Sequence, residues 1–374
     1  MTYRILLLSA YDAMSHKMWR EGLEQMFPEH AWTQLKLPPR NFNWRIRGNS
    51  LQWALNERER LEQDYDLLIA TSMVDLASLR GFVPQLSRLP SLVYFHENQF
   101  VYPAGSEQRA SNIEPQLVPL YAAFCADAIA FNSDYNRSTF LQGAAQLLDR
   151  LPDKLGPALL AKLETSVVLP VPVQEFERPD AAEATKTILD VVWNHRWEYD
   201  KGPHRLLQLV ETIAARRLPI RLHVVGQQFR SLPEGFVQIG SLLQQHAAAL
   251  GMEAGQFGFI EDRSEYITLL RHCDVVLSTA AHDFQGLAMQ EACALGCTPL
   301  APNALVYPEY IQPACLYECT GQDGQEGGVA ELLDRLLQWQ QMRSGGVALP
   351  KLELQHFTPR ALKPRYAELF ARLL

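Results

Sequence analysis

The stretch Ile188-Leu189-Asp190-Val191-Val192-Trp193, followed by His195-Arg196-Trp197-Glu198-Tyr199-Asp200-Lys201-Gly202, decides the fold of the second half of the chain. The apolar run predicts a buried strand, because parallel strands covered on both faces are almost continuously hydrophobic. The loop that leaves this strand carries a guanidinium, Arg196, and an ammonium, Lys201, five residues apart. Two cations at the end of such a strand suit a diphosphate.

A second stretch, Asp283-Phe284-Gln285-Gly286-Leu287-Ala288-Met289-Gln290-Glu291, places two carboxylates eight residues apart and a glycine before a helical segment. A helix N-terminus favours an anion. Glu291, one or two turns into that helix, can accept hydrogen bonds from a ribose diol. Together the two stretches predict a site for a nucleotide diphosphate that carries a sugar.

Strand-like and helix-like segments alternate on both sides of these stretches, which predicts βαβ units and parallel sheets covered on both faces. The expected strands are Ile5–Leu8, Leu67–Ala70, Leu92–Phe95, Ala128–Phe131, Val167–Leu169, Ile188–Trp193, Leu222–Val225, Phe257–Phe259, Val275–Ser278 and Thr298–Leu300. The expected helices are His16–Phe27, Asn49–Gln63, Val74–Gly81, Gln116–Cys125, Asn136–Leu148, Val329–Met342 and Pro359–Leu374, and Thr320–Gly328 resembles a loop.

Proline and charge cluster in residues 170–186, which indicates a linker. We therefore expect an α/β protein with two Rossmann-like, doubly wound domains that face a cleft. The predicted domains are 1–174 and 175–358, and the second carries both stretches and therefore the predicted nucleotide-sugar site. Residues 359–374 are expected to form a helix that packs back on the first domain. Ligands bind at the carboxyl ends of the strands in such sheets, where both stretches fall.

The composition is that of an ordinary soluble protein. A chain of 374 residues is longer than a domain with one hydrophobic core usually is. No run reaches the about 18–20 apolar residues that a membrane span needs. The first residues resemble a strand more than a signal peptide, so we expect a cytoplasmic protein. The net charge of −8 means that a polyanion partner must be held by a local basic patch. The sequence is silent on oligomeric state.

Two sequence patterns resemble metal-binding motifs, but we expect neither to bind a metal. The spacing of Cys293 and Cys297 could suggest zinc, but no histidine lies close in sequence, so the six cysteines are expected to be reduced, packed thiols. Asp64-Tyr65-Asp66 has the Asp-x-Asp spacing of metal-dependent sugar transferases. It lies between a helix and a buried strand of the first domain, so we expect no metal site.

Several short motifs accompany the two stretches, and with them the chain resembles the GT-B glycosyltransferases, in particular the large retaining family with a carboxylate–seven residues–carboxylate pattern. Finer features are similar to one branch, the tRNA-queuosine mannosyltransferases, over almost the whole length. The motifs are Ser15-His16-Lys17, Trp44-Arg45-Ile46-Arg47, Tyr94-Phe95-His96-Glu97-Asn98-Gln99 with Tyr102-Pro103, Phe131-Asn132-Ser133, Ser278-Thr279-Ala280 with His282, and Leu305-Val306-Tyr307-Pro308-Glu309.

The resemblance implies a role for each matching residue. Arg196 and Lys201 clamp the donor diphosphate, Asp283 meets the sugar, and Glu291 meets the ribose. The implied catalytic residues are His96, Arg196, Lys201 and Asp283. The implied donor-binding residues are Arg196, Lys201, His282, Asp283, Phe284, Gly286, Leu287 and Glu291. The implied acceptor-binding residues are Ser15, His16, Arg45, Arg47, Glu97, Asn98 and Gln99.

The implied reaction is transfer of mannose, with retention, from GDP-mannose to queuosine in the anticodon loop of tRNA(Asp), without a metal or further cofactor. Cations on the diphosphate stabilise the charge that gathers on the leaving group, and the leaving phosphate takes the acceptor proton. Two departures from the family matter. Asp283 stands where glutamate is usual, and Ala13-Met14 stand where relatives often carry glycines, which puts a close phosphate approach in doubt.

Each site residue also has a purely structural interpretation. Arg196 and Lys201 could be a solvated surface pair, and Asp283 could cap the following helix. Glu291 sits among apolar residues and would be costly there without a partner. His96 could be a buried structural histidine, and His282 could be an ordinary loop residue.

The segment 35–60 is the candidate basic patch. It carries Lys36, Arg40, Arg45, Arg47, Arg58 and Arg60 with Phe42, Trp44 and Trp53. Arginines with aromatics suit looped RNA, although a solvent-facing loop with core tryptophans would have the same composition. Two other functions stay open: a transferase for a lipid, glycan or small molecule, and a non-catalytic RNA- or nucleotide-binding protein on the same scaffold.

Overall fold

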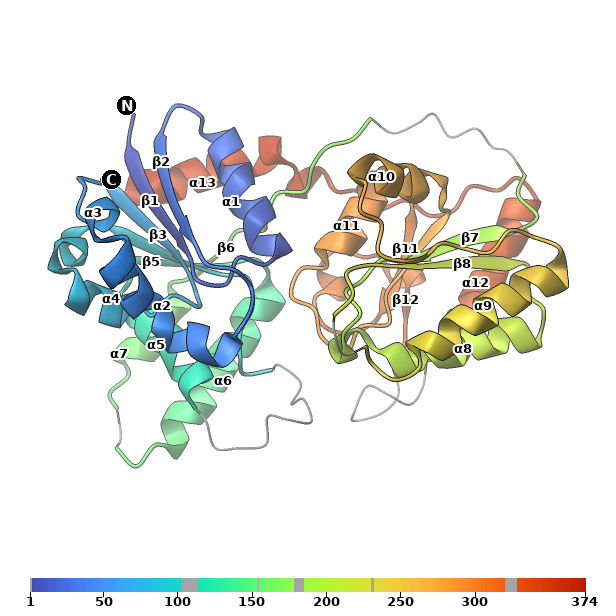
Figure 1. Ribbon diagram of the computed structural model, residues 1–374, viewed down its shortest axis with the longest axis horizontal. Helices are drawn as coiled ribbons and strands as arrows, with labels where there is room; N and C mark the ends of the chain where they lie inside the picture. The colour runs from blue at the N-terminus through green and yellow to red at the C-terminus, as the bar shows by residue number, and fades with distance from the viewer. Residues whose placement is uncertain (1, 102–112, 154, 178–184, 230–231, 320–327) are drawn as a thin grey trace. The chain divides into compact units, whose positions relative to one another are not determined.

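The computed structural model describes residues 2–101, 113–153, 155–177, 185–229, 232–319 and 328–374. The chain divides by its contacts into unit 1, Met1–Pro172 with Gln355–Leu374, and unit 2, Val173–Leu354. Tyr102-Pro103, residues 178–184 of the expected linker and residues 320–327 of the expected loop lie outside the described residues. Each unit is an α/β layer structure of its own (Figure 1).

Unit 1 is built on a parallel six-stranded sheet in the order β2-β1-β3-β4-β5-β6. The order reverses between β1 and β3, which makes that position the topological switch point. The strands are β1 (Arg4–Ser9), β2 (Ala31–Lys36), β3 (Leu67–Thr71), β4 (Ser91–Phe95), β5 (Ala128–Phe131) and β6 (Val167–Val168). The helices are α1 (Met14–Met26), α2 (Phe42–Asn56), α3 (Arg58–Leu61), α4 (Leu76–Phe82), α5 (Glu114–Cys125), α6 (Asp134–Arg150), α7 (Ala158–Glu164) and α13 (Pro359–Leu373), with 3₁₀ turns η1 (Pro84–Arg88) and η5 (Gln355–Phe357).

The last helix completes the cover of unit 1. Alternate strand residues such as Leu8, Ala70 and Val93 join one core with α2, α4 and α6. The opposite face is covered by α1 and α13, which lie side by side (Figure 1). There Trp19 of α1 donates a hydrogen bond of 2.9 Å to the Tyr366 hydroxyl of α13. A segment about 350 residues away in sequence therefore closes the core of the first unit.

Unit 2 has a parallel six-stranded sheet in the order β12-β11-β10-β7-β8-β9. Counted within the unit, this is the doubly wound order of dinucleotide-binding folds, with its switch point between β7 and β10. The strands are β7 (Leu189–Trp193), β8 (Ile220–Val225), β9 (Phe257–Gly258), β10 (Val275–Leu277), β11 (Thr298–Pro302) and β12 (Leu316–Tyr317). The helices are α8 (Pro203–Ala215), α9 (Phe236–Leu250), α10 (Arg263–His272), α11 (Leu287–Ala294) and α12 (Val329–Ser344), with 3₁₀ turns η2 (Tyr199–Lys201), η3 (Tyr307–Glu309) and η4 (Pro313–Cys315).

The α/β class and the parallel sheets confirm the expectation from the sequence, while some elements differ. Strand β2 was not predicted, because Ala31–Lys36 alternates with polar residues at the sheet edge. The expected helix Asn49–Gln63 was wrong at both ends: α2 begins at Phe42, and α3 is a separate turn after Glu57. The turn at Asn41 is left-handed, with φ of 57°, which asparagine tolerates and simple periodicity does not reveal.

Candidate active site

The carboxyl ends of β7 and β10 meet at the switch point of unit 2. The Thr279 hydroxyl after β10 donates to the Lys201 carbonyl at 2.7 Å and accepts from the Trp193 indole at 2.9 Å. Gly202 lies so close that a Cβ there would stand 2.0 Å from the Thr279 carbonyl oxygen, and its φ is +65°. The two quoted stretches therefore lie together at one edge of the sheet.

Lys201 is the buried cation of this site, with 8% of the residue exposed. Its ammonium donates to the His282 carbonyl oxygen at 2.7 Å. It also lies 3.2 Å from an Asp200 carboxylate oxygen and 3.8 Å from an Asp283 carboxylate oxygen. These contacts exclude the interpretation of Lys201 as a solvated surface lysine.

Asp283 is held from several sides. Its Oδ1 accepts from the Gly286 backbone N–H at 3.1 Å, and its Oδ2 accepts from the Tyr307 hydroxyl at 3.0 Å. The carboxylate therefore does bond the start of α11, as the structural alternative expected, and it also faces Lys201. Burial by itself raises the pKa of Asp283, but Lys201 and the surrounding polar groups outweigh burial and hold that pKa below its ordinary value.

Glu291 has a partner that the sequence did not reveal. Its carboxylate pairs with the Arg263 guanidinium at the start of α10. Arg263 also lies over the Tyr266 ring, 5.4 Å from its centroid. The Tyr266 hydroxyl accepts from the Asn194 side chain at 2.9 Å. Because Asn194 directly follows β7, these contacts connect Glu291 to the end of that strand. No local pattern could predict a pair separated by 28 residues.

Two histidines border Lys201 and stay neutral. Burial first, and then the positive charge of Lys201, lowers the pKa of His195 to about 4 and that of His282 to about 4. His195 packs against the Trp193 indole with ring centroids 5.1 Å apart. His282 contacts the Phe284 ring edge to face at 4.5 Å. Uncharged imidazoles beside a lysine leave the lysine as the main positive charge of the site.

The remaining predicted donor residues frame the same edge. Arg196 is partly exposed on the loop after β7 and forms an ion pair of 2.9 Å with Glu198. Gly286, with φ of +73°, turns the chain into α11 at Leu287, and a Cβ at Gly286 would stand 2.5 Å from the Tyr310 hydroxyl. Phe284 is buried. All predicted donor-binding residues thus come from the loops after β7 and β10 and from α11.

The residues predicted in unit 1 fall into two groups. One lies around the start of α1 and the end of β4, and the other, Arg45 and Arg47, lies on α2. His96, just beyond β4, packs on His16 of α1 with ring centroids 4.0 Å apart, and the Ser15 hydroxyl lies 3.4 Å from His16 Nδ1. Asn98 is buried and donates to the Asn136 side chain of α6 at 2.9 Å, so it fixes the loop after β4. Glu97 and Gln99 flank it and are partly buried. Burial and the neighbouring His16 lower the pKa of His96 well below its ordinary value.

The glycine-poor loop after β1 has a simple explanation. Ala13 has φ of −67° and ψ of 170°, which any residue adopts, so the loop needs no glycine at this position. Arg20 and Asp12 pair at 3.0 Å beneath it.

The arginines of α2 are engaged within the protein to a greater extent than the composition of segment 35–60 indicates. Arg47 pairs at 3.1 Å with the buried Asp75 and at 3.1 Å with Glu114, so it ties α2 to its neighbours. Arg45 is mostly buried. By contrast, Trp44 is 54% exposed and lies over Gly48, where a Cβ would stand 2.3 Å from the indole. Trp53 is a core residue, as the alternative interpretation held.

Neither metal-binding pattern gains support within the described residues, which contain no group of three or more histidine, cysteine or acidic side chains placed to hold a metal. Asp66 accepts from the Arg4 backbone N–H at 2.7 Å, an anchor between two strands. All six cysteines are free thiols. In the described part of the chain, no helix has the length and hydrophobicity to cross a membrane.

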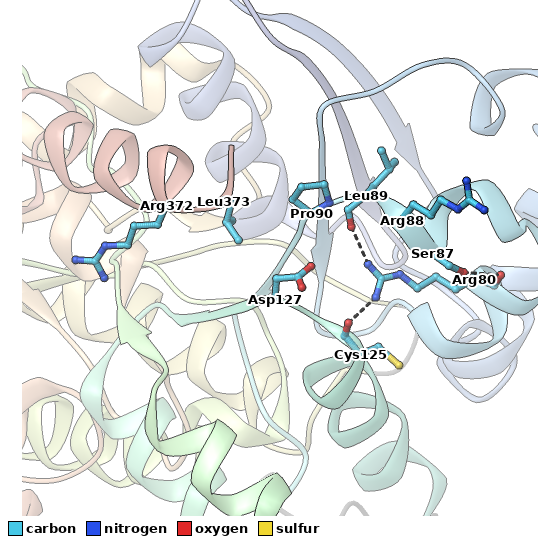
Figure 2. A pocket seen from close by; sticks show the side chains of 9 residues that line it. All are labelled: Arg80, Ser87, Arg88, Leu89, Pro90, Cys125, Asp127, Arg372 and Leu373. Atoms are coloured by element: carbon cyan, nitrogen blue, oxygen red, sulfur yellow. Dashed lines mark hydrogen bonds between the residues drawn. The ribbon is translucent and has the colours of Figure 1, made fainter.

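A pocket of about 460 Å³ lies elsewhere in unit 1, at the amino ends of β4 and β5. Figure 2 shows the Arg80 guanidinium bonded to the carbonyl oxygens of Leu89 and Cys125. Asp127 accepts from the Ser91 backbone N–H at 2.9 Å. The Arg80 and Asp127 side chains are therefore engaged by the protein itself. The pocket is also at the opposite edge of the sheet from the predicted site residues.

Comparison with known proteins first gives the class. The fold is similar to that of Anabaena HepE in complex with UDP (TM-score 0.61, 16% identity, all of both chains) and of the E. coli trehalose-6-phosphate protein bound with UDP-2-fluoro glucose (TM-score 0.63, 15% identity, 99% of this chain and 98% of that one). The family model described as Glycosyl transferases group 1 matches residues 174–344. The chain is a glycosyltransferase with the GT-B fold.

The family follows from the first half of the chain. The model described as tRNA-queuosine alpha-mannosyltransferase N-terminal matches residues 4–173. A tRNA-queuosine alpha-mannosyltransferase of Drosophila melanogaster is 32% identical over 325 residues, which is 84% of this chain and 83% of the relative. The chain belongs to the tRNA-queuosine alpha-mannosyltransferase family.

Proposed function

We propose that this protein transfers mannose from GDP-mannose to queuosine in the anticodon loop of tRNA(Asp), with retention of the anomeric configuration and without a metal. The observation that carries the proposal is the relative named tRNA-queuosine alpha-mannosyltransferase, which is 32% identical over 84% of the chain. The switch-point site of unit 2 supports it, because its cations and acids have the chemistry that a nucleotide diphosphate sugar needs.

In the proposed reaction, Lys201 and Arg196 stabilise the diphosphate as the bond to the sugar breaks. Lys201 lies buried and close to Asp283, so charge at this position acts with little screening. Glu291 accepts from the ribose, and Arg263 orients its carboxylate. Asp283 is ionised and fixed by Tyr307, which suits an acceptor for sugar hydroxyls. The leaving phosphate takes the proton of the acceptor hydroxyl.

For the acceptor, the structure changes which residues we favour. Arg47 is engaged in two ion pairs, so we assign it to holding α2 rather than to RNA. The exposed Trp44 is the better candidate for stacking on an unpaired base. Because tRNA is the proposed acceptor, we also retain the cytoplasm as the proposed location.

The test is transfer by the purified protein from labelled GDP-mannose to tRNA(Asp) that contains queuosine, with the same tRNA carrying guanosine at that position as the matched control. We expect one added hexose on the modified nucleoside by mass and none on the control. A parallel reaction with UDP-glucose as the donor tests the specificity for the nucleotide base and for the sugar.

Other outcomes would support the competing functions. Equal labelling of both tRNAs, or labelling of a lipid alone, would overturn the proposed acceptor. Binding of GDP-mannose and tRNA without transfer would indicate a non-catalytic protein.

A further inference from the structure

The pocket of about 460 Å³ in unit 1 has an excess of positive charge on its wall. Its charged lining residues are three arginines, Arg80, Arg88 and Arg372, and one acid, Asp127. They come from separate parts of the chain: α4, η1, α13 and the residue before β5. Since the whole chain has a net charge of −8, three cations against one acid around a single cavity are a local feature of this surface.

Arg80 is the fixed cation of the pocket. Its guanidinium donates to the carbonyl oxygens of Cys125 and Leu89 and, at 2.9 Å, to the Ser91 hydroxyl. The Ser91 hydroxyl in turn donates to the Asp127 carboxylate at 2.8 Å. The acceptors of Arg80 are therefore neutral oxygens, and the acid of the pocket is held by Ser91 instead of by an arginine.

Arg88 and Arg372 are the accessible cations. Arg88 is exposed, and its side chain forms no hydrogen bond or ion pair with the described residues. Arg372 pairs with Glu368, four residues earlier on α13, and both side chains are 64% exposed. An exposed pair of this kind contributes little stability, so another anion can replace Glu368. Figure 2 shows Arg88 and Arg372 on opposite sides of Asp127.

This arrangement suits a ligand that carries phosphates. Arginine presents a planar fork of N–H donors that matches the oxygens of a phosphate. Because the two accessible guanidinium groups lie on opposite sides of the pocket, a ligand with several phosphates in a row can contact both. The backbone of an RNA is such a ligand.

The position of the pocket separates it from the reaction. It lies at the amino ends of β4 and β5, whereas the candidate His96 follows the carboxyl end of β4. Strand β4 has five residues, so the two edges of the sheet are about 17 Å apart. A single nucleoside is too short to bridge this distance, but the backbone of a folded RNA can do so.

We propose that the pocket between Arg88 and Arg372 binds the sugar–phosphate backbone of the acceptor tRNA, at nucleotides away from the one that receives the sugar. The inference rests on the proposed function, which supplies the tRNA. Contacts with phosphates add affinity that does not depend on base sequence, and this affinity falls as the salt concentration rises. The pocket therefore strengthens tRNA binding without taking part in the transfer step.

The test uses Arg88→Gln, Arg372→Gln and the double variant of the full-length protein, with Arg271→Gln as the matched control. Arg271 is exposed in the last turn of α10 in unit 2, and its replacement removes the same charge. We expect the Kd for tRNA(Asp) to rise roughly 3- to 10-fold for each arginine removed from the pocket. The slope of log Kd against log salt should fall by about one for each. The Kd for GDP-mannose, kcat at saturating tRNA and Tm should equal those of the wild type.

Two results would overturn the proposal. The first is tRNA binding by the double variant that equals wild-type binding at every salt concentration. The second is an equal loss of binding in Arg271→Gln, which would indicate a general effect of net charge.

Titration with inorganic phosphate distinguishes RNA from a free phosphorylated compound. If phosphate raises the Tm of the wild type but not that of the double variant, while tRNA binding is the same in both, the pocket binds a small anion and the RNA assignment is wrong.

The binding assay also separates this inference from the proposed function. If the wild-type protein binds tRNA but transfers no mannose, the proposed function fails. Weaker tRNA binding by the double variant would still support the pocket in that case, and unchanged binding would overturn it.

Discussion

At the scale of single residues, two charged side chains of the site in unit 2 have different surroundings. The two side chains are Lys201 and Glu291. Lys201 is buried between two carboxylates, whereas the partner of Glu291, Arg263, has a half-exposed side chain. Loss of a cation from buried carboxylates is costly, while loss of an acid from an exposed arginine is not.

We predict that Glu291→Gln loses most transfer activity through a higher KM for the donor, while stability changes by less than about 1 kcal/mol. Glutamine keeps the size but is a weaker partner for a ribose diol. The measurements are donor KM and urea unfolding. Wild-type kinetics in this variant would contradict the assignment of Glu291 to the ribose.

Lys201→Met should lose transfer and also about 3 kcal/mol or more of stability, because Asp200 and Asp283 lose their common cation. Recovery of stability, without activity, in Lys201→Met combined with Asp200→Asn would confirm the origin of the loss.

The buried histidines predict a dependence of stability on pH. The pKa of His195 is lowered to about 4 in the folded protein, below its ordinary value in the unfolded chain. The unfolded state then binds more protons between pH 6.5 and 4, so stability is full above pH 6.5 and falls as the pH drops toward 4. Unfolding free energies across this range should fall less steeply in His195→Gln. An identical pH profile in the variant would exclude His195 as a cause.

At the scale of elements, the loop between β7 and α8 is fixed by backbone contacts. Gly202 adopts a positive φ and leaves no space for a Cβ beside the Thr279 carbonyl. This contact joins the loops after β7 and β10, which carry Lys201 and Asp283. The distance between the lysine and the acid therefore depends on a residue that has no side chain.

We predict that Gly202→Ala lowers stability by about 1–3 kcal/mol and raises donor KM, because the new methyl group separates the two loops. Gly81→Ala in α4 is the matched control, since no atom lies within 4 Å of a Cβ there. A helical glycine replaced by alanine should be neutral or slightly stabilising. The Gly202 assignment fails if both variants behave alike in thermal unfolding and kinetics.

At the scale of the whole molecule, the end of the chain completes the unit in which the chain begins. Tyr366 of α13 accepts from Trp19 and donates to the Pro170 carbonyl at 3.0 Å. Phe370 packs on Phe27 with ring centroids 5.3 Å apart. One face of the first sheet therefore depends on residues of α13.

We predict that deletion of residues 355–374 exposes Trp19 and unfolds unit 1, because a large apolar area returns to water. Deletion of Leu374 alone, which is partly exposed, is the control. Tryptophan fluorescence and limited proteolysis report the outcome. A truncated protein that is as resistant to protease as the wild type would contradict this role of α13.

The sequence by itself determined the α/β class and most of the strands, and it predicted the residues of the candidate donor site. It could do so because buried parallel strands are continuous apolar runs, and because Arg196, Lys201, Asp283 and Glu291 fall within short motifs of fixed spacing. Local periodicity also located α11 and α13.

Only the tertiary structure decided which partners those residues have. The Arg263–Glu291 pair, the Arg47 ion pairs and the pocket that Arg88 and Arg372 share depend on strand order and helix packing. These bring together residues far apart in the chain. Such contacts leave no local pattern, because a side chain meets its partner only after the sheets have formed.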